Sequence, residues 1–156
     1  MKILFLDIDG VLNSTKFFYE KNELEYYKNI SFPLDSFDYR KIELLNYILD
    51  ETNAKLVISS DWRYDDDLEP CLKFHGLKYE IYGRTPYDKH GRRGYEVQKY
   101  LLSLKEEIDN YCIIDDIDEW FLPIQSNNVV KTTFNEGLTK ELSEKVINIL
   151  NNKLYV

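Results

Sequence analysis

Two aspartates, Asp7 and Asp9, follow a short apolar run near the start of the chain. The run, residues 3–6, contains four apolar side chains in succession, which predicts a strand buried on both faces of a parallel sheet. The carboxylates then lie at the carboxyl end of this strand, where open α/β sheets bind their ligands. They are two positions apart, so both can point to the same side, and Gly10 permits a sharp turn behind them. The pair predicts catalysis by carboxylates or a bound cation.

Phosphoryl transfer is one chemistry that two such acids can perform. A carboxylate can attack phosphorus when a cation and fixed donors neutralise the phosphoryl oxygens. A second acid protonates the leaving oxygen and later deprotonates a water, a contribution of roughly 10²–10⁴-fold. The alternatives are a solvated strand end and a calcium loop of the EF-hand type. The EF-hand does not fit, because it needs a preceding helix and a glycine at its sixth position, whereas Gly10 is fourth from Asp7.

The composition is that of a globular protein with an acidic balance. A length of 156 residues suits one domain, so we expect a single unit over residues 1–156. The net charge of −8 argues against unspecific coating of nucleic acid, which needs a basic surface, but it is compatible with a local basic groove. The two cysteines form no disulfide framework, and no stretch suits a signal sequence or a membrane span. These features predict a cytoplasmic protein without a membrane partner and leave its oligomeric state open.

Two further predicted strands end in side chains that suit phosphoryl chemistry. An apolar run over residues 55–60 closes with two serines, and one over residues 111–116 closes with two aspartates. The residues in question are Ser59, Ser60, Asp115 and Asp116. Hydroxyls can donate to a phosphoryl oxygen, and Mg²⁺ prefers carboxylates together with a carbonyl and water. Taken alone, two serines or two aspartates at a strand end more often form a turn than a site, but two strands that end in acids are much less common in one chain.

The rest of the chain alternates helices with strands. A helix is predicted over about 39–52, between Asp38 as its N-cap and Asn53 at its end. Further helices are expected over 69–76, after Gly94 and after Thr139, and further strands over 78–82 and 128–133, with a turn at 83–86. This alternation predicts a three-layer α/β fold with a mostly parallel sheet.

The order of these elements resembles that of the haloacid dehalogenase (HAD) superfamily over nearly the whole chain. Residues 7–12, Asp-Ile-Asp-Gly-Val-Leu, are similar to its first motif. The resemblance implies a Rossmann-like HAD fold, Mg²⁺ as the cofactor, and a phosphatase that acts through an aspartyl-phosphate. By position, Asp7 corresponds to the nucleophile and Asp9 to the general acid and base.

The resemblance also implies roles for the other strand ends. Ser59 matches the hydroxyl that binds the phosphoryl group, with Ser60 as its neighbour. Asp115 is favoured as the metal ligand and Asp116 is second, together with the two aspartates of the first motif.

Phosphoryl transfer at this site also requires a fixed positive charge. A phosphate dianion next to several carboxylates needs a cationic side chain in addition to the metal ion. The third motif of the superfamily supplies it from a Lys or Arg near the start of a helix. Arg93 matches best, and Arg92 and Lys89 compete with it. A solvated basic loop is the alternative interpretation of all three.

Asp61-Trp62-Arg63, directly after the two serines, narrows the resemblance. Ser-Ser-x-Trp-Arg is similar to a small, cap-poor subgroup found with Swiss Army Knife RNA repair proteins, where the middle residue is often Ser. Here Asp61 removes that hydroxyl. Arg63 could bind a phosphate and Trp62 could stack on a base or a sugar. Both could equally attach the loop to the core.

Residues 14–37 are rich in aromatic and charged side chains and have no clean period. In the HAD superfamily this place holds a short helical turn and a β-hairpin flap, sometimes enlarged into a cap. The length of the segment suffices for a flap or a small lid, which implies a minimal cap and an open site. The aromatic side chains are expected to pack the flap onto the body, with stacking on a base as the alternative.

The residues and the resemblance together favour a Mg²⁺-dependent phosphomonoesterase, and the resemblance implies a phosphorylated nucleic-acid end as its substrate. Nucleotides or other small phosphates are the alternative substrates, because the net charge is acidic. A catalytically silent module that binds phosphate is another alternative, although such a module has no need of Asp9. Dehalogenation needs no Mg²⁺ and leaves the aspartate pair at 115–116 without a role.

Overall fold

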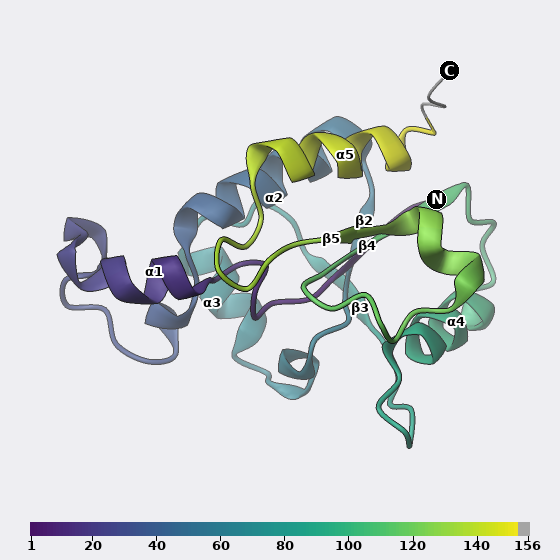
Figure 1. Ribbon diagram of the computed structural model, residues 1–156, viewed down its shortest axis with the longest axis horizontal. Coiled ribbons are helices and arrows are strands. Elements are labelled where there is room, and N and C mark those ends of the chain that lie inside the picture. Colours follow the sequence, from purple (N-terminus) through teal and green to yellow (C-terminus); the bar gives the residue numbers. More distant parts are fainter. Residues whose placement is uncertain (153–156) are drawn as a thin grey trace.

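The computed structural model describes residues 1–152 and shows a five-stranded sheet in which every pairing is parallel. Its strands are β1 (Lys2–Leu6), β2 (Lys55–Ile58), β3 (Ile81–Arg84), β4 (Asn110–Asp115) and β5 (Val129–Lys131). They lie in the order β3-β2-β1-β4-β5, so β1 is the central strand (Figure 1). The predicted α/β fold with a parallel sheet is confirmed.

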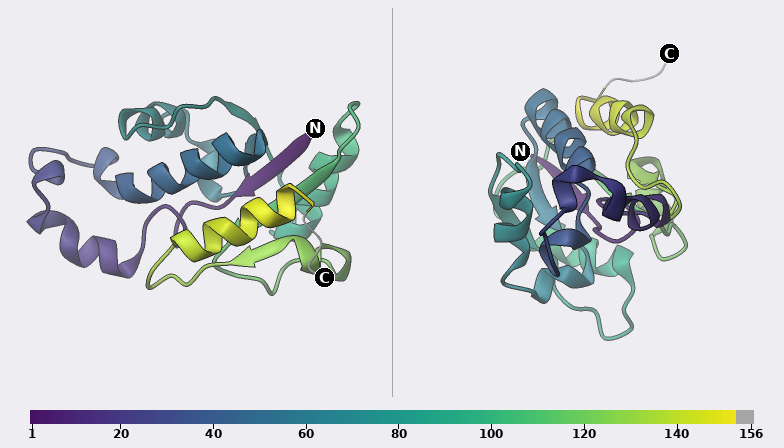
Figure 2. Two further views of the ribbon diagram at one scale, coloured as in Figure 1. Left: turned by 90° about the horizontal axis from the view of Figure 1, so that it is seen from above. Right: turned by 90° about the vertical axis from the view of Figure 1, so that its left-hand side faces the viewer.

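Helices cover both faces of this sheet (Figures 1 and 2). The helices of the structure are α1 (Thr15–Glu20), α2 (Tyr39–Thr52), α3 (Leu68–Phe74), α4 (Arg93–Ser103) and α5 (Lys140–Leu150), of which α1 lies in the insert described below and the others pack on the sheet. Leu4 and Leu6 of β1 pack in one apolar cluster with residues of α2, α3 and α5, whereas Ile3 and Phe5 pack in another with Val97 of α4. The alternation of side chains along β1 therefore fills two cores, one on each face. None of the described helices is long and apolar enough to cross a membrane.

The register of the central strands aligns their carboxyl ends. Leu6 is paired with Ile58 of β2 and with Ile114 of β4, so the next residue of each strand lies in one row. The backbone N–H of Asp7 donates to the Ile114 carbonyl at 3.0 Å, and that of Ser59 donates to the Leu6 carbonyl at 2.9 Å. Asp7 is thereby held between the end of β2 and the end of β4.

Local capping signals define two of the helices as the sequence predicts. Asp38 accepts a hydrogen bond from the backbone N–H of Arg40 at the start of α2, and Asn53 ends the helix in the left-handed conformation, with φ of 57°. Thr139 caps α5 by accepting from the backbone N–H of Leu142 at 3.2 Å. Both helices present their apolar faces to the same core.

The third strand differs from its prediction. It spans Ile81–Arg84 instead of 78–82, so the expected turn at 83–86 is wrong for its first two residues. Gly83 lies within the strand. The ring of Tyr100 from α4 packs directly on it, so a Cβ at this position would overlap the tyrosine hydroxyl. The glycine therefore serves a close approach and not a turn. Lys78 remains outside the strand, and its backbone N–H donates to the Asn46 side chain at 3.0 Å.

Residues 14–37 form a helical insert that projects from one end of the molecule (Figure 2). The insert contains α1 and three 3₁₀ turns, at Lys21–Glu23, Glu25–Tyr27 and Leu34–Ser36, and none of its residues belongs to a strand. The insert is thus helical, unlike the β-hairpin flap that the HAD resemblance implies. Phe17 and Tyr27 are buried with their ring centroids 5.1 Å apart, which packs the insert onto itself. The ring of Tyr27 also lies 5.8 Å from that of His75, which packs the insert onto the body.

His75, the residue after α3, joins the insert to the body. Its Nε2 lies 2.5 Å from the Leu34 carbonyl oxygen, and its Nδ1 lies 2.9 Å from the Tyr26 hydroxyl. A carbonyl only accepts, so the ring carries its proton on Nε2 and accepts from the tyrosine through Nδ1. Burial lowers the pKa of His75, while the Leu34 carbonyl and Asp38 oppose the shift.

We expect acid to weaken this attachment. The folded protein binds a proton at His75 less readily than the unfolded chain does, so its contribution to the free energy of unfolding is complete above the ordinary pKa of 6.5 and is lost as the pH falls below it. His75→Gln should flatten this part of the profile, because glutamine does not titrate. Chemical unfolding of both proteins between about pH 5 and about pH 8 measures the difference. Parallel profiles would contradict the prediction.

Candidate active site

Three carboxylates meet where β1 and β4 end. Asp7 follows β1, Asp115 ends β4 and Asp116 comes next, and one carboxylate oxygen of each lies within 4.8 Å of the others. Asp7 and Asp115 are buried, and Asp116 is half-buried. These are three of the four carboxylates that the sequence predicts as metal ligands. Asp9, the fourth, directs its carboxylate to other partners.

The electrostatics of this cluster favour a bound cation. Burial raises the pKa of Asp7, and the neighbouring Asp115 raises it further, whereas Arg93 opposes the shift. Burial also raises the pKa of Asp115, against the lowering effects of the Ile117 backbone N–H and of Arg93. The three carboxylates carry more negative charge than the one guanidinium of Arg93 can balance. Such a cluster fits a hard divalent cation, which binds oxygen ligands and keeps them ionised. The donor set therefore fits Mg²⁺.

Arg93, the first residue of α4, lies against these acids. Its Nη1 is 4.0 Å from Asp7 Oδ1, and its Nε is 3.8 Å from Asp115 Oδ2. The Nη1 atom is buried without a hydrogen-bond partner in residues 1–152. Among the three candidate cations, Arg92 instead pairs with Asp88 at 3.6 Å, and Lys89 is exposed. The structure therefore brings Arg93 to Asp7 and Asp115 and directs Arg92 elsewhere.

The two serines after β2 have different surroundings. Ser59 Oγ is completely buried, and no described residue forms a hydrogen bond with it. A buried hydroxyl without a partner is costly unless a ligand satisfies it. Ser60 Oγ accepts from the backbone N–H of Trp62 at 3.2 Å and caps the 3₁₀ turn Asp61–Tyr64. Ser59 is thus available for a phosphoryl oxygen, and Ser60 is engaged in shaping the loop.

Asp9 stands at the exposed edge of the cluster. Its Oδ1 accepts from Asn13 Nδ2 at 2.9 Å, and its Oδ2 accepts from Trp62 Nε1 at 3.1 Å. A cavity of about 770 Å³ opens beside it. The cavity is lined by Asp9, Asp61, Trp62, Tyr64, Asp65, Asp66 and Asp67. Asp9 therefore faces open space that a leaving group can enter, and that space is acidic.

Gly10 and Asn13 shape the loop that carries Asp9. Gly10 has φ of +82°, and a Cβ there would lie 2.8 Å from Asp116 Cγ. Asn13 is fully buried and accepts from the Gly10 backbone N–H at 2.9 Å while it donates to Asp9. Asn13 was not singled out in the sequence, although a polar residue directly after an apolar pair in the motif is a signal that could have found it. These two hydrogen bonds close the loop, and a third, from Asn13 Nδ2 to the Ser36 carbonyl at 3.0 Å, connects it to the segment before α2.

Arg63 pairs with carboxylates other than those of the cluster. Both its side chain and that of Glu96 in α4 are 3% exposed, and the two form an ion pair. Arg63 Nη1 also donates to the Ser60 carbonyl at 3.1 Å, and Nη2 donates to the Tyr64 hydroxyl at 2.8 Å. Of the two roles considered for Arg63, this geometry favours attachment of the loop to the core. Sequence reasoning did not find Glu96.

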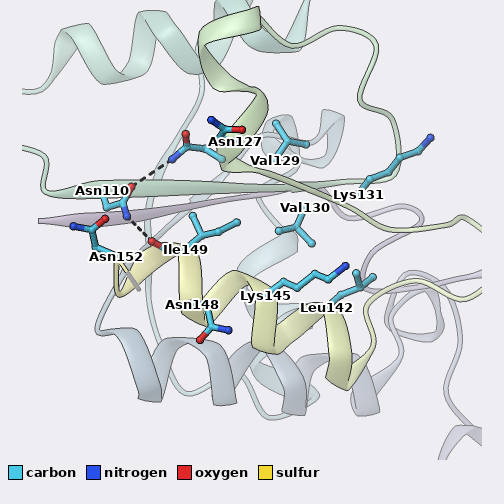
Figure 3. Close-up of a pocket in the computed structure, with 11 residues that line it drawn as sticks. Asn110, Asn127, Val129, Val130, Lys131, Leu142, Lys145, Asn148, Ile149 and Asn152 are labelled. Carbon is cyan, nitrogen blue, oxygen red and sulfur yellow. Dashed lines mark hydrogen bonds between the residues drawn. The ribbon is translucent and has the colours of Figure 1, made fainter. Parts of the chain in front are cut away.

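A second cavity, of about 860 Å³, lies between α5 and the edge strand β5 (Figure 3). Valine, leucine, isoleucine, asparagine and lysine side chains line it, and no carboxylate, histidine or hydroxyl is among them. Figure 3 shows Asn110 in its wall, bonded to the carbonyl of Ile149. This cavity contains no nucleophile or acid, so the smaller one beside Asp9 is the candidate for chemistry.

We expect Mg²⁺ to stabilise the protein, and to do so more at alkaline pH. Without a cation, the contribution of Asp7 to the free energy of unfolding is largest below its ordinary pKa of 3.8 and is lost as the pH rises through its raised pKa in the folded state. A cation bound by the three carboxylates removes this cost. Mg²⁺ at about 100 times its Kd should add about 2.7 kcal/mol.

Thermal unfolding in Mg²⁺ and in EDTA, at about pH 5 and about pH 8, measures this effect. The gain should be larger at the higher pH, where the ligands are ionised, and Asp116→Asn should reduce it. Equal melting temperatures in the two buffers at both pH values would contradict a cation site here.

Comparison with known proteins gives one family. A family model described as the HAD domain in Swiss Army Knife RNA repair proteins matches residues 3–142, which include every site residue described above. No curated protein and no solved structure matches the chain significantly.

Proposed function

The chain belongs to the family of HAD domains in Swiss Army Knife RNA repair proteins, and from this premise we propose that it is a Mg²⁺-dependent phosphomonoesterase. Membership of this family supports a phosphatase-type hydrolase activity in general. The observation that carries the finer proposal is the row formed by Asp7, Ser59 and Asp115, with Arg93 beside it. The hydroxyl of Ser59 has no hydrogen-bond partner within residues 1–152. Nucleophile, phosphate donors and cation ligands then share one edge of the sheet.

In the proposed reaction Asp7 is the nucleophile. One of its carboxylate oxygens forms a bond to phosphorus while the bond from phosphorus to the leaving oxygen breaks, and Asp9 gives that oxygen a proton. A water then attacks phosphorus, Asp9 takes a proton from it, and the bond between phosphorus and Asp7 breaks. The products are the free alcohol and inorganic phosphate.

Other side chains hold the phosphoryl group during both steps. Ser59 donates its hydroxyl to a phosphoryl oxygen, and the guanidinium of Arg93 neutralises part of the negative charge. Asp7, Asp115 and Asp116 would hold Mg²⁺, which neutralises charge on the phosphoryl oxygens when it is bound. Because Asp7 and Asp115 are buried, these charges act with little screening from water.

Two substrate classes follow from different observations. The family name points to a phosphorylated RNA end, and the narrow insert at 14–37 is too small to form a separate domain over the site. The cavity beside Asp9 is lined by Asp61 and by three successive aspartates at 65–67, a charge that repels a polyanion. This lining favours nucleotides or other small phosphates as the second candidate.

Phosphate release tests the proposal. The panel contains oligonucleotides with 3′- or 5′-phosphates, mononucleotides and sugar phosphates, each with Mg²⁺ and with EDTA. Turnover of oligonucleotide ends would support end repair. A plot of the logarithm of the binding constant against the logarithm of the salt concentration, with a slope of about −0.7 per phosphate contacted, would indicate binding along a single strand. Turnover confined to small phosphates would assign the second class.

A silent phosphate-binding module is distinguished by the same panel. Folded, Mg²⁺-loaded protein that releases no phosphate from any substrate, yet is stabilised by inorganic phosphate, would replace the phosphatase proposal with the binding module. Protein that shows neither property would leave both without support.

A further inference from the structure

Trp62 reaches Asp9 from a different loop. Its indole Nε1 donates to Asp9 Oδ2 at 3.1 Å, whereas the other carboxylate oxygen is bonded by Asn13. Asn13 belongs to the loop that carries Asp9, so its hydrogen bond cannot fix that loop relative to the loop after β2. The hydrogen bond from the indole can fix the two loops relative to each other, because Trp62 lies in the 3₁₀ turn Asp61–Tyr64 after β2.

The indole itself is held firmly. The ring of Phe37 meets it edge-on, with centroids 5.0 Å apart, and Ser60 Oγ accepts from the Trp62 backbone N–H. The next residue, Arg63, is buried in its ion pair with Glu96, which attaches the turn to α4. The indole N–H is therefore presented to Asp9 from a rigid support.

We propose that Trp62 is a positioning residue that aims the Asp9 carboxylate at the leaving oxygen of the substrate. This inference rests on the proposed phosphatase function. Asp9 is exposed, so without the indole its Oδ2 is free to turn toward solvent. Asp9 and Trp62 line the same cavity of about 770 Å³, which is open space that a leaving group can enter. Proton transfer requires hydrogen-bond reach and alignment, and Trp62 supplies the alignment.

The leaving group gives a readout that a purely structural role would not change. Phenyl phosphate releases a basic phenolate that needs a proton, whereas 4-nitrophenyl phosphate releases a stable anion that does not. The two substrates have nearly the same shape. The ratio kcat/KM reports the steps up to the first cleavage, so it isolates the step in which Asp9 acts as an acid.

Trp62→Phe removes the N–H and keeps an aromatic ring against Phe37. We expect kcat/KM for phenyl phosphate to fall about 10–100-fold, part of the 10²–10⁴-fold that acid catalysis contributes, and kcat/KM for 4-nitrophenyl phosphate to fall less than about threefold. Trp120→Phe is the matched control, because this tryptophan is 53% exposed and lies in another loop. Trp120→Phe should leave kcat/KM unchanged for both phenyl phosphate and 4-nitrophenyl phosphate.

A double-mutant cycle with Asp9→Ala shows whether Trp62 acts through Asp9. In that background Trp62→Phe should cost nothing further on phenyl phosphate. An equal loss on both substrates, or the same loss in the Asp9→Ala background, would overturn the inference and make Trp62 a packing residue. Wild-type protein that turns over neither substrate nor any member of the panel would instead overturn the proposed function.

The contact itself is tested without turnover. The chain contains two tryptophans, so its ¹H–¹⁵N spectrum should show two indole N–H signals, and Trp120→Phe assigns the one from Trp62. Asp9→Ala should shift this signal and speed its exchange with solvent, because the acceptor is lost. A Trp62 signal that does not respond would show that the hydrogen bond is absent in solution and would overturn the inference.

Discussion

Replacing Asp7 with asparagine is expected to lower kcat by at least about 10³-fold on every substrate that the wild-type protein hydrolyses. An amide oxygen of the same size fills the place between the ends of β2 and β4 but does not form the covalent intermediate. Phosphate release under single-turnover and steady-state conditions measures the loss. Retention of more than about a tenth of the activity would remove Asp7 from the nucleophile role.

The same variant provides its own control for folding. Asp7 is a buried carboxylate beside Asp115, and burial raises its pKa, so the neutral amide relieves a repulsion. Asp7→Asn should therefore unfold at a temperature equal to or above that of the wild-type protein in EDTA, and it should gain less from Mg²⁺. A variant that is inactive because it is unfolded would show the opposite.

Replacing Glu96 with alanine should produce the largest loss of stability, about 3–5 kcal/mol. The change leaves the Arg63 guanidinium buried without its carboxylate, and it also removes the side-chain oxygen, Oε2, that accepts from the Asp88 backbone N–H at 3.3 Å. Urea unfolding measures the loss. Glu106→Ala, an exposed change of the same type, should stay within about 0.5 kcal/mol of the wild type.

A second variant separates packing from charge. Arg63→Met combined with Glu96→Leu replaces the pair by apolar side chains, and it should recover most of the stability that Glu96→Ala loses. If Arg63 bound the phosphate directly, Glu96→Ala would leave stability nearly intact and would weaken phosphate binding alone. That result would contradict the attachment of the loop by this ion pair.

The positions of the main acids could be predicted because they depend on local rules. An apolar run followed by polar residues places Asp7, Ser59 and Asp115 at strand ends, and a parallel sheet brings such ends to one edge. The bounds of α2 followed from a capping aspartate and from an asparagine that adopts the left-handed conformation. In each case the signal lies within a few residues of the feature that it predicts.

The remaining features depend on contacts between distant segments. Glu96 looks like a solvated residue of a helix until α4 is placed beside the loop that contains Arg63. Gly83 looks like a turn glycine until Tyr100 packs on it. The hydrogen bond from Trp62 to Asp9 likewise exists only because two loops meet above adjacent strands. The sequence contains these residues but does not state their partners.

The central place of β1 also decides when during synthesis the site can exist. β1 precedes the other described strands in the chain, yet its two neighbours are residues 55–58 and 110–115. Parallel strands pair only across long connections, which makes such sheets slow to form. A nascent chain that has not reached Asp116 carries Asp7 without the partner acids, so the crowding of carboxylates arises only once β4 pairs with β1. Mg²⁺ can therefore secure the finished sheet but cannot nucleate it.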